Sequence, residues 1–426
     1  MESFVIKGGQ PLSGTIRPAG NKNAALPIVA ASLLADEPVV LRNVPQILDV
    51  ETMLELVAST GATVERLGPH QVRIDPRGLR RASLDPALCT RIRASVLLAA
   101  PLVARTGHCL LPPPGGDVIG RRRLDTHLLA FRSLGVHASF DRALEREVGL
   151  LRGAPMFLDE ASVTATENAV MAAVLAEGET TIGNAACEPH VQDLCRFLVG
   201  LGARIHGIGS NLLRIEGVER LGGGEHTIGS DYIEVASFVG LAAVTGGELT
   251  VEGVIEDDLR PVEVGFNRLG LAWELDGDRL QVPRDQVMEV EDDLGQAIPT
   301  IDDGPWPAFP ADLTSIAVAV ATQARGTVLI FEKMFENRLV FVDKLVGMGA
   351  RIVVCDPHRV VVNGPTQLYG ERLESPDIRA GMALLLAALA ADGESVIGNV
   401  GQIDRGYERI DERLQAVGAD IERIRE

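Results

Sequence analysis

One pattern occurs six times in this chain and limits its fold more than any other feature. Each copy has an apolar stretch rich in small residues, a charged or glycine turn, an alternating strand, and an amphipathic helix that ends at a glycine. The period is roughly 70 residues, longer than that of most solenoid repeats. The six terminating pairs are Gly61-Ala62, Gly135-Val136, Gly202-Ala203, Gly270-Leu271, Gly349-Ala350 and Gly418-Ala419. The fold is therefore built by repetition, and residues that interrupt the pattern are candidates for function.

The first copy illustrates the expected elements. Residues 23–35 are apolar on nearly every side, which predicts a helix buried all round. Residues 39–44 predict a strand, and residues 49–60 carry apolar side chains at helical spacing on one face only. Helices inside, with strands and amphipathic helices around them, predict an inside-out α/β architecture. Three repeats in each of two domains would give threefold pseudo-symmetry, with a break near the glycine run at 222–224 and a site in the cleft between the domains.

Composition excludes several classes of function. The chain has 426 residues and a formal net charge of −19, which argues against general nucleic-acid binding and makes any arginine cluster more informative. The five cysteines are scattered without a CxxC motif, so we expect neither a disulfide nor a zinc site, and a reducing cytoplasm fits best. The first residues lack an apolar signal region, and no apolar stretch approaches the roughly 20 residues of a membrane span.

Polar residues stand at the starts of the apolar helices, where a core would exclude them. Asparagine, serine and aspartate there are also good N-caps, and capping is the simpler interpretation for Asp231 and Asp377. Cations at helix N-termini oppose the helix dipole, so Lys22, Arg93 and Arg379 fit better beside a bound anion. The full set is Lys22, Asn23, Arg93, Ser162, Asp231, Glu234, Asp312, Asp377 and Arg379.

Two further segments break the repeat. Residues 111–125 (LPPPGGDVIGRRRLD) combine a stiff proline run with glycines, which is typical of a hinged lid. Asp117 follows the glycines, and the arginines at 121–123 could be either a solvated charge run or a phosphate-binding group. No Walker loop is present. The last segment, 402–409 (QIDRGYER), adds Arg405.

These residues together indicate a class of chemistry. Lys22, Arg93, Arg122, Arg379 and Arg405 supply cations, and the carboxylates best placed among them are those of Asp117 and Asp312. Such a set fits a phosphorylated or carboxylated small substrate and general acid–base catalysis. The residues alone do not name the reaction.

Six motifs give the chain a close resemblance, from end to end, to the UDP-N-acetylglucosamine enolpyruvyl transferase family. They are GNKNAALP (Gly20–Pro27), IRASVL (Ile92–Leu97), GVERLGGG (Gly217–Gly224), PAFPADL (Pro307–Leu313), FENR (Phe335–Arg338) and IDRGYERI (Ile403–Ile410). The resemblance implies a two-domain inside-out α/β barrel whose first strand belongs to the C-terminal domain. We therefore expect one domain at 22–229 and the other at 1–21 plus 230–426.

The resemblance also implies a reaction. The family transfers the enolpyruvyl group of phosphoenolpyruvate to the 3′-hydroxyl of UDP-N-acetylglucosamine and releases phosphate, as the first committed step of peptidoglycan synthesis. It needs neither a metal nor an organic cofactor. The resemblance also implies that the cleft closes on the substrate, which keeps water away from the reacting groups.

Residue roles follow from the same resemblance. Asp117 on the lid, Asp312, Lys22 and Arg405 would be catalytic, with Asp312 as the base near the sugar hydroxyl. Lys22, Arg122, Arg379 and Arg405 would hold phosphoenolpyruvate, and Asp312 and Asp377 would also be substrate-binding residues. The nucleotide sugar would be lined by Asn23, Arg93, Arg122, Arg123, Leu124, Asp125, Thr126, Ser162, Val163 and Met334.

Several positions depart from the family pattern. Asp117 stands where the family most often has cysteine, the residue that the epoxide fosfomycin alkylates, so we expect insensitivity to fosfomycin. The acceptor side differs at Arg123, Glu160, Thr164 and Tyr232, and Gln402 replaces a histidine. These differences keep open an enolpyruvyl transferase for another nucleotide or nucleotide sugar in secondary metabolism. A catalytically inactive nucleotide-sugar sensor is the alternative from outside the enzymes.

Overall fold

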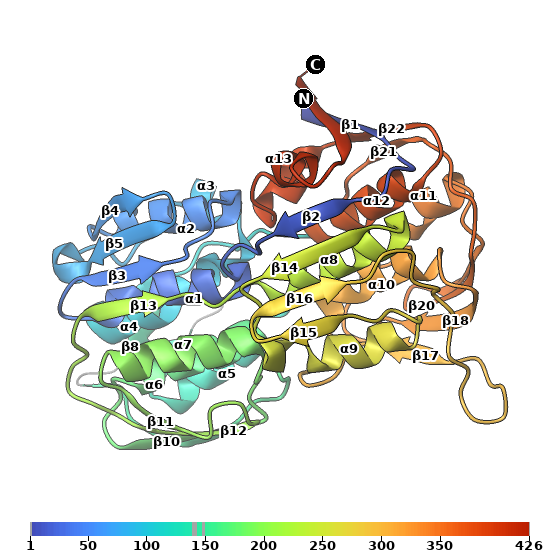
Figure 1. Cartoon of the computed structure of the whole chain (residues 1–426). Coiled ribbons are helices and arrows are strands. Elements are labelled where there is room, and N and C mark those ends of the chain that lie inside the picture. The colour runs from blue at the N-terminus through green and yellow to red at the C-terminus, as the bar shows by residue number, and fades with distance from the viewer. Residues whose placement is uncertain (1, 139–142, 147–149, 426) are drawn as a thin grey trace. The chain divides into compact units, whose positions relative to one another are not determined.

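The computed structural model describes residues 2–138, 143–146 and 150–425. They form two compact units, which we describe separately (Figure 1). Unit 1 contains Met1–Ala19, Val118–Arg121 and Ser230–Glu426, and unit 2 contains Gly20–Asp117 and Arg122–Gly229. The glycine run at 222–224 precedes the strand β13 (Gly224–Thr227), which pairs with β3 (Val39–Arg42). That pairing keeps these residues in unit 2, and the change of unit follows only after Gly229.

Unit 2 contains three buried helical segments surrounded by amphipathic helices and sheets. The buried segments are α1 (Lys22–Ala31), η3 (Arg93–Leu98) continuing into α4 (Ala99–Thr106), and α6 (Val163–Ala173). The amphipathic helices are α2 (Leu48–Ser59), α5 (Asp125–Ser133) and α7 (Pro189–Gly200). Short turns of helix complete the unit: η1 (Ser32–Leu34), η2 (Pro76–Gly78) and α3 (Pro86–Cys89).

Unit 1 repeats this plan. Its buried helices are α8 (Tyr232–Thr245), α10 (Thr314–Ala321) and α12 (Ile378–Ala390), whose mostly alanine, leucine and valine side chains are almost all inaccessible. The amphipathic helices are α9 (Arg260–Asn267), α11 (Val342–Gly347) and α13 (Ile410–Gln415). Short 3₁₀ segments are η4 (Glu256–Asp258), η5 (Ala311–Leu313) and η6 (Val400–Arg405).

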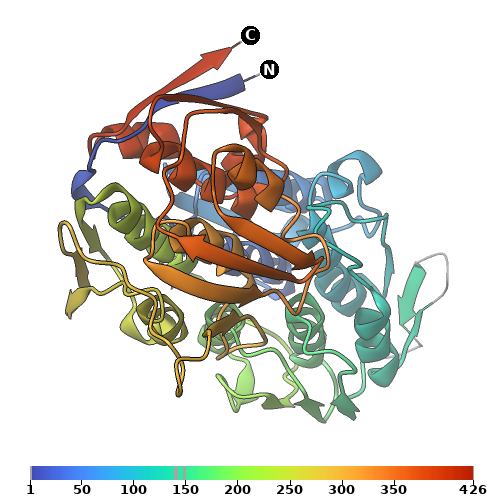
Figure 2. The same cartoon turned by 90° about the vertical axis from the view of Figure 1, so that its right-hand side faces the viewer.

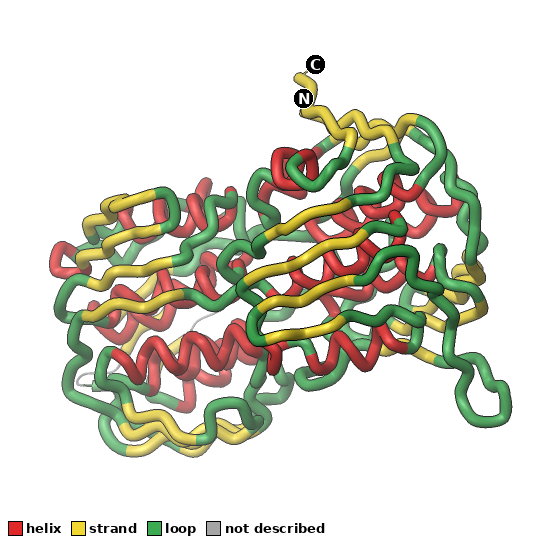
Figure 3. Tube along the Cα trace, viewed as in Figure 1, coloured by secondary structure: helices red, strands yellow, loops and turns green. Residues whose placement is uncertain are grey.

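Figure 3 shows the strands of each unit lying in sheets against the helices. In the described residues each unit has three sheets, and five of the six sheets share one pairing pattern: a parallel pair followed by two antiparallel strands. In unit 2 the orders are β13-β3-β5-β4 and β9-β10-β12-β11; in unit 1 they are β2-β14-β16-β15, β17-β18-β20-β19 and β21-β22-β1-β23. The unit 2 strands are β3, β4 (Thr63–Gly68), β5 (Gln71–Asp75), β9 (Pro155–Phe157), β10 (Glu179–Gly183), β11 (Arg204–His206), β12 (Leu212–Glu216) and β13. The unit 1 strands are β1 (Glu2–Lys7), β2 (Ser13–Ile16), β14 (Glu248–Glu252), β15 (Glu274–Asp276), β16 (Arg279–Val282), β17 (Thr300–Asp302), β18 (Gly326–Phe331), β19 (Ile352–Asp356), β20 (Arg359–Gly364), β21 (Arg372–Glu374), β22 (Glu394–Gly398) and β23 (Asp420–Arg425).

Two of the sheets differ from the rest in how their strands are assembled. In the last sheet, β1 lies antiparallel between β22 and β23, so the two ends of the chain lie side by side (Figure 2). The remaining sheet, in unit 2, has three strands within the described residues: β6 (His108–Leu110), β8 (Ala143–Arg146) and β7 (Val136–Ala138). An isolated parallel bridge from Ser83 to Leu110 stands where the other sheets have a parallel strand.

The glycines that close the six repeats share one backbone conformation. Their φ angles are 103° at Gly61, 83° at Gly135, 107° at Gly202, 78° at Gly270, 106° at Gly349 and 98° at Gly418. Positive φ ends a helix with little strain only at a residue without a Cβ atom. The repeat read from the sequence is thus a repeat of backbone geometry, and the predicted inside-out α/β architecture is confirmed.

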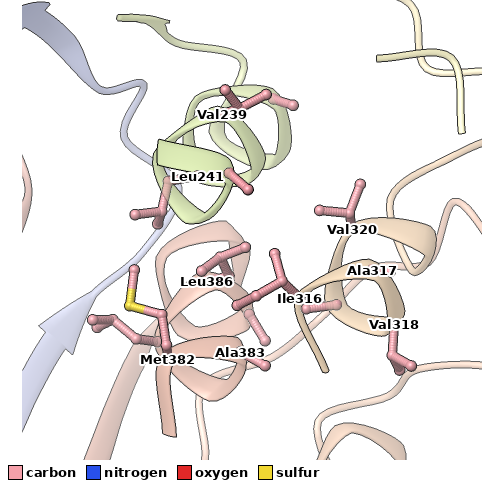
Figure 4. Close-up of a cluster of buried hydrophobic side chains, with 14 of the residues drawn as sticks. Val239, Leu241, Ile316, Ala317, Val318, Val320, Met382, Ala383 and Leu386 are labelled. Carbon is pink, nitrogen blue, oxygen red and sulfur yellow. The ribbon is translucent and has the colours of Figure 1, made fainter. Parts of the chain in front are cut away.

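The centre of unit 1 is aliphatic. Helices α8, α10 and α12 contact one another pairwise, and Figure 4 shows Ile316, Val320 and Leu386 among the side chains between them. Gly240 lies at this crossing, because a Cβ atom there would meet side chains of both other helices at 3.1–3.3 Å. In the described part of the chain, no helix is both long and apolar enough to cross a membrane.

Candidate active site

In unit 2, the first turn of α1 holds Lys22 in a buried position. Asn21 caps this helix by accepting a hydrogen bond of 3.0 Å from the backbone N–H of Ala24. Lys22 Nζ lies 2.8 Å from Asp49 Oδ2, and both side chains are nearly inaccessible. Asp49, on α2, therefore balances the cation that opposes the helix dipole. Asn23 follows on the same turn and is half-buried.

Arg93 starts η3 and is held by the chain that follows the proposed lid. Its Nη2 donates to the carbonyl oxygens of Arg122 at 2.7 Å and Arg123 at 3.2 Å. Arg123 is itself paired, with Nε 2.9 Å from Asp125 Oδ2 and Nη2 3.2 Å from Asp159 Oδ2. The arginine run is therefore more than a solvated charge run, because its third member is held by two carboxylates.

Around the start of α5, Asp159 links several of the predicted residues. It accepts a hydrogen bond of 2.7 Å from the hydroxyl of Thr126 in addition to its ion pair with Arg123. Leu124 is the N-cap residue of α5, and Asp125 is its first residue. Sequence reasoning missed Asp159, which has no motif of its own. Glu160, a departure from the family pattern, is exposed.

The start of α6 is capped as predicted. Ser162 accepts a hydrogen bond of 3.4 Å from the N–H of Ala165, and Val163 is the first helical residue. The next residue, Thr164, lies 3.2 Å from His127 Nε2, while Asn168 Nδ2 donates to His127 Nδ1 at 2.9 Å. Burial lowers the pKa of His127 to about 3, so the ring is neutral and its proton lies on Nε2, facing Thr164.

The proposed lid is an irregular segment whose glycines pack closely against residues 89–93. The backbone N–H of Gly115 donates to the carbonyl of Cys89 at 3.0 Å. A Cβ atom at Gly115 would lie 1.7 Å from the carbonyl oxygen of Thr90, and one at Gly116 would lie 2.7 Å from Cβ of Arg93. Close backbone approach therefore requires both glycines. Asp117 follows them and is half-buried.

Residues 118–121 belong to unit 1 and contact the FENR segment there. Glu336 accepts a hydrogen bond of 3.1 Å from the backbone N–H of Arg121. The N–H of Asn337 donates to the carbonyl of Ile119 at 2.9 Å. Gly120 makes this possible, because a Cβ atom at its φ of 151° would lie 2.1 Å from Glu336 Oε2.

In unit 1, the carboxylate of Asp312 is held by two buried arginines. Arg338 Nη2 donates to Oδ1 at 2.8 Å, and Arg379 Nη2 donates to Oδ2 at 3.0 Å. The arginine side chains are 2% and 4% exposed, whereas Asp312 is 28% exposed. Both of its oxygens are thus oriented from the buried side while the carboxylate stays accessible. Arg338 belongs to the FENR motif, the signal from which its role could have been found.

The remaining predicted residues of unit 1 lie on neighbouring helix ends. Asp377 caps α12, with Oδ1 accepting from the N–H groups of Arg379 and Ala380 at 2.9 Å each, so the capping interpretation is confirmed. Asp231 caps α8 in the same way. The guanidinium of Arg379 lies 5.5 Å from the ring centre of Tyr407.

Arg405 and Met334 make hydrogen bonds to residues that are close to them in the sequence. At the end of η6, Arg405 Nη1 donates to Gln402 Oε1 at 2.8 Å, so the glutamine that departs from the family pattern positions this cation. Met334 is half-buried, and its backbone N–H donates to Glu332 Oε1 at 3.1 Å.

The predicted residues thus form two groups. Unit 2 contributes Lys22, Asn23, Arg93, Asp117, Arg122, Arg123, Leu124, Asp125, Thr126, Ser162 and Val163; unit 1 contributes Asp312, Met334, Asp377, Arg379 and Arg405. Cations with fixed partners and an accessible carboxylate suit an anionic substrate and proton transfer. Among the described residues, no three histidine, cysteine, aspartate or glutamate side chains cluster as metal ligands.

Residues 6–414 match the family model of EPSP synthase (3-phosphoshikimate 1-carboxyvinyltransferase). The chain belongs to this family of carboxyvinyltransferases.

Curated relatives within the family carry one particular name, UDP-N-acetylglucosamine 1-carboxyvinyltransferase. The protein of that name from Treponema denticola is 55% identical over 99% of both chains. The one from Bradyrhizobium diazoefficiens is 56% identical over 99% of this chain and 98% of its own.

Solved structures agree on the fold. The enolpyruvyl transferase NikO from Streptomyces tendae is 25% identical, with a TM-score of 0.87 over 99% of both chains. An EPSP synthase from Acinetobacter baumannii is 18% identical, with a TM-score of 0.77 over the full length of both, which is a likeness of fold alone.

Proposed function

We propose that this protein transfers the enolpyruvyl group of phosphoenolpyruvate to the 3′-hydroxyl of UDP-N-acetylglucosamine and releases phosphate, a step in building peptidoglycan. One observation carries the proposal: relatives that bear this name are more than half identical over 99% of this chain. The motifs that hold the candidate site residues support it from within the chain.

Unit 1 supports a general base. The sugar hydroxyl must lose a proton as its oxygen bonds to C2 of phosphoenolpyruvate, and a carboxylate can accept that proton. Asp312 is suited to the task, because two arginines fix both of its oxygens while the carboxylate stays accessible. Arg379 and Arg405 are the cations that we assign to phosphoenolpyruvate in this unit.

Unit 2 supports binding of the phosphate-bearing groups. The substrate carries a phosphate and a carboxylate, and the phosphate leaves with additional negative charge. Lys22 and Arg122 are the assigned cations, and Arg93 orders the segment that carries Arg122 through its bond to the Arg122 carbonyl. Fixed cations of this kind stabilise the charge that develops on the leaving group.

Asp117 is assigned to proton transfer at the methylene carbon. The enol methylene gains a proton as the tetrahedral ketal forms, and the resulting methyl group loses one as phosphate leaves, so one group can serve both steps. A carboxyl group can carry that proton, although it lacks the nucleophilicity of a thiolate. The protein is therefore proposed to be insensitive to fosfomycin.

The alternative acceptor is less well supported. An enolpyruvyl transferase for another nucleotide or nucleotide sugar would fit the departures at Arg123, Glu160 and Thr164. However, Glu160 is exposed, and Arg123 is held by Asp125 and Asp159. The solved enolpyruvyl transferase NikO is only 25% identical, against 55% for the relatives named for UDP-N-acetylglucosamine.

Phosphate release by the purified protein tests the proposal. We expect release from phosphoenolpyruvate that requires UDP-N-acetylglucosamine, and a loss of roughly a hundredfold or more in kcat for Asp312→Asn, which keeps the shape but cannot accept the proton. Asp302→Asn, which changes a half-exposed carboxylate of the same unit, serves as the matched control and should keep the activity.

Each of the other possible results of this experiment would lead to a different conclusion. Release that requires a different nucleotide would support the alternative acceptor. Release that persists in Asp312→Asn would refute the assigned base. No release with any acceptor would refute the enzymatic function and favour a nucleotide-sugar sensor.

A further inference from the structure

Two buried carboxylic acids lie behind the arginine that holds Asp312. Asp303 directly follows β17 and Glu332 directly follows β18, and these strands are parallel neighbours with Asp302 opposite Phe331. The carboxyl ends of parallel neighbours meet at one edge of a sheet, so the two side chains are brought together. Asp303 is 2% exposed and Glu332 is 0% exposed.

One oxygen of each acid has donors. Glu332 Oε1 accepts from the backbone N–H groups of Met334 at 3.1 Å and Phe335 at 3.0 Å, and Asp303 Oδ1 accepts from the N–H of Lys333. The other two oxygens, Glu332 Oε2 and Asp303 Oδ2, are buried and make no hydrogen bond of good geometry to a described residue, although the Thr314 hydroxyl interacts with the Glu332 carboxyl group. Two such oxygens are costly unless something satisfies them, and one proton between them would satisfy both.

Arg338 separates this pair from the proposed base. Its Nε lies 4.0 Å from Glu332 Oε2 and has no acceptor among the described residues, while its Nη2 lies 2.8 Å from Asp312 Oδ1. We propose that Asp303 and Glu332 share one proton and act as a positioning pair that holds Arg338 against Asp312. The catalytic consequence rests on the proposed function; the shared proton does not.

The neighbouring charges explain why the pair keeps its proton. Three carboxylates stabilise the charge of Arg338, first Asp312, then Asp377 and then Glu332, while Arg379 opposes it, so two carboxylates outside the pair contribute more than the pair does. Burial and the neighbouring Asp303 raise the pKa of Glu332 to about 8. Loss of the shared proton would place a second negative charge beside Arg338 Nε and draw the guanidinium away from Asp312.

Two other charged groups face Glu332. His358 Nδ1 lies 2.7 Å from its carbonyl oxygen, from the turn between β19 and β20. Lys333 follows it in the chain and pairs with Asp302. Neither contacts Glu332 Oε2 or Asp303 Oδ2, so substitutions of His358 and of Asp302, the partner of Lys333, serve as controls.

The pH dependence of kcat tests the positioning role. In the unaltered protein, kcat should fall above about pH 8, approaching roughly tenfold per pH unit as the proton is lost. Asp303→Asn replaces the shared proton by an amide hydrogen that does not titrate in this range, so the ratio of kcat at pH 9.5 to kcat at pH 7.5 should approach one. Asp302→Asn and His358→Gln should keep the alkaline fall. An alkaline fall that is absent in the unaltered protein, or unchanged in Asp303→Asn, overturns the proposal.

A second measurement is independent of activity. If the pair takes up a proton on folding, the urea midpoint of unit 1 should decrease between pH 6 and pH 8.5, and Asp303→Asn should reduce that decrease. If the protein released no phosphate but its urea midpoint depended on pH more strongly than that of Asp303→Asn, the proposed function would be refuted and the shared proton would still be supported. Equal pH dependence in the two proteins would overturn the pair whatever the activity.

Discussion

The crossing of α8, α10 and α12 allows a quantitative test of the packing in unit 1. Leu386 is fully buried there, and Leu386→Ala removes three carbon groups, worth about 2.4 kcal/mol at roughly 0.8 kcal/mol each. The helices already approach closely at Gly240, so the cavity cannot collapse. With the cavity included, we expect a loss of about 4 kcal/mol in the free energy of unfolding.

Gly240→Ala makes the prediction sharper. The new Cβ atom would lie 3.1 Å from Leu386 Cδ2 and Val320 Cγ2 and 3.3 Å from Ile316 Cγ2. Overpacking of this size costs about 2 kcal/mol, and the better helix propensity of alanine returns about 1 kcal/mol, for a net loss of about 1 kcal/mol. In the double variant the methyl group enters the space that Leu386 has left. We expect the free energy of unfolding of the double variant to decrease by about 3 kcal/mol rather than by the additive sum of about 5 kcal/mol.

Tryptophan fluorescence reports selectively on the unfolding of unit 1. The chain has two tryptophans, Trp273 and Trp306, and both belong to unit 1. Urea titrations of the four proteins give the coupling free energy directly. Additive losses, within about 0.5 kcal/mol, would refute the argument that these side chains meet at one crossing.

Three further predictions concern the site and unit 2. Asp117→Cys should create inhibition by fosfomycin where the unaltered protein shows none, because a thiolate can be alkylated by the epoxide; inhibition of the unaltered protein would contradict the assignment. Asp49→Ala should destabilise unit 2 by about 3 kcal/mol in urea titrations followed by circular dichroism, since it removes the carboxylate that pairs with buried Lys22; a change below about 1 kcal/mol would show that Lys22 does not depend on this partner. Burial raises the pKa of Glu167, so the contribution of this residue to stability is greatest below the ordinary glutamate pKa and is lost as the pH rises. Glu167→Gln should reduce this pH dependence of the free energy of unfolding, and equal slopes in the two proteins would refute burial as its cause.

The candidate site shows which roles can be read from local pattern. Ser162, Asp231 and Asp377 are identified as caps because a cap needs only its own helix, and the structure places them so. Lys22, Arg93 and Arg379 are identified as anomalous cations by the same local rule. Their partners lie elsewhere in the chain: Asp49, the carbonyls of 122–123, and Asp312. Of these partners, sequence reasoning named Arg122, Arg123 and Asp312 as site residues but did not name Asp49.

The sequence by itself determined the six repeats, the buried helices and the glycines that end each repeat, because all three depend on short-range periodicity and on backbone angles that only glycine adopts easily. Only the tertiary structure decided that Arg338 holds Asp312 and that Asp303 meets Glu332. Neighbouring parallel strands bring together residues that are distant in the chain, and burial then determines whether their charges can persist. No local pattern encodes either effect.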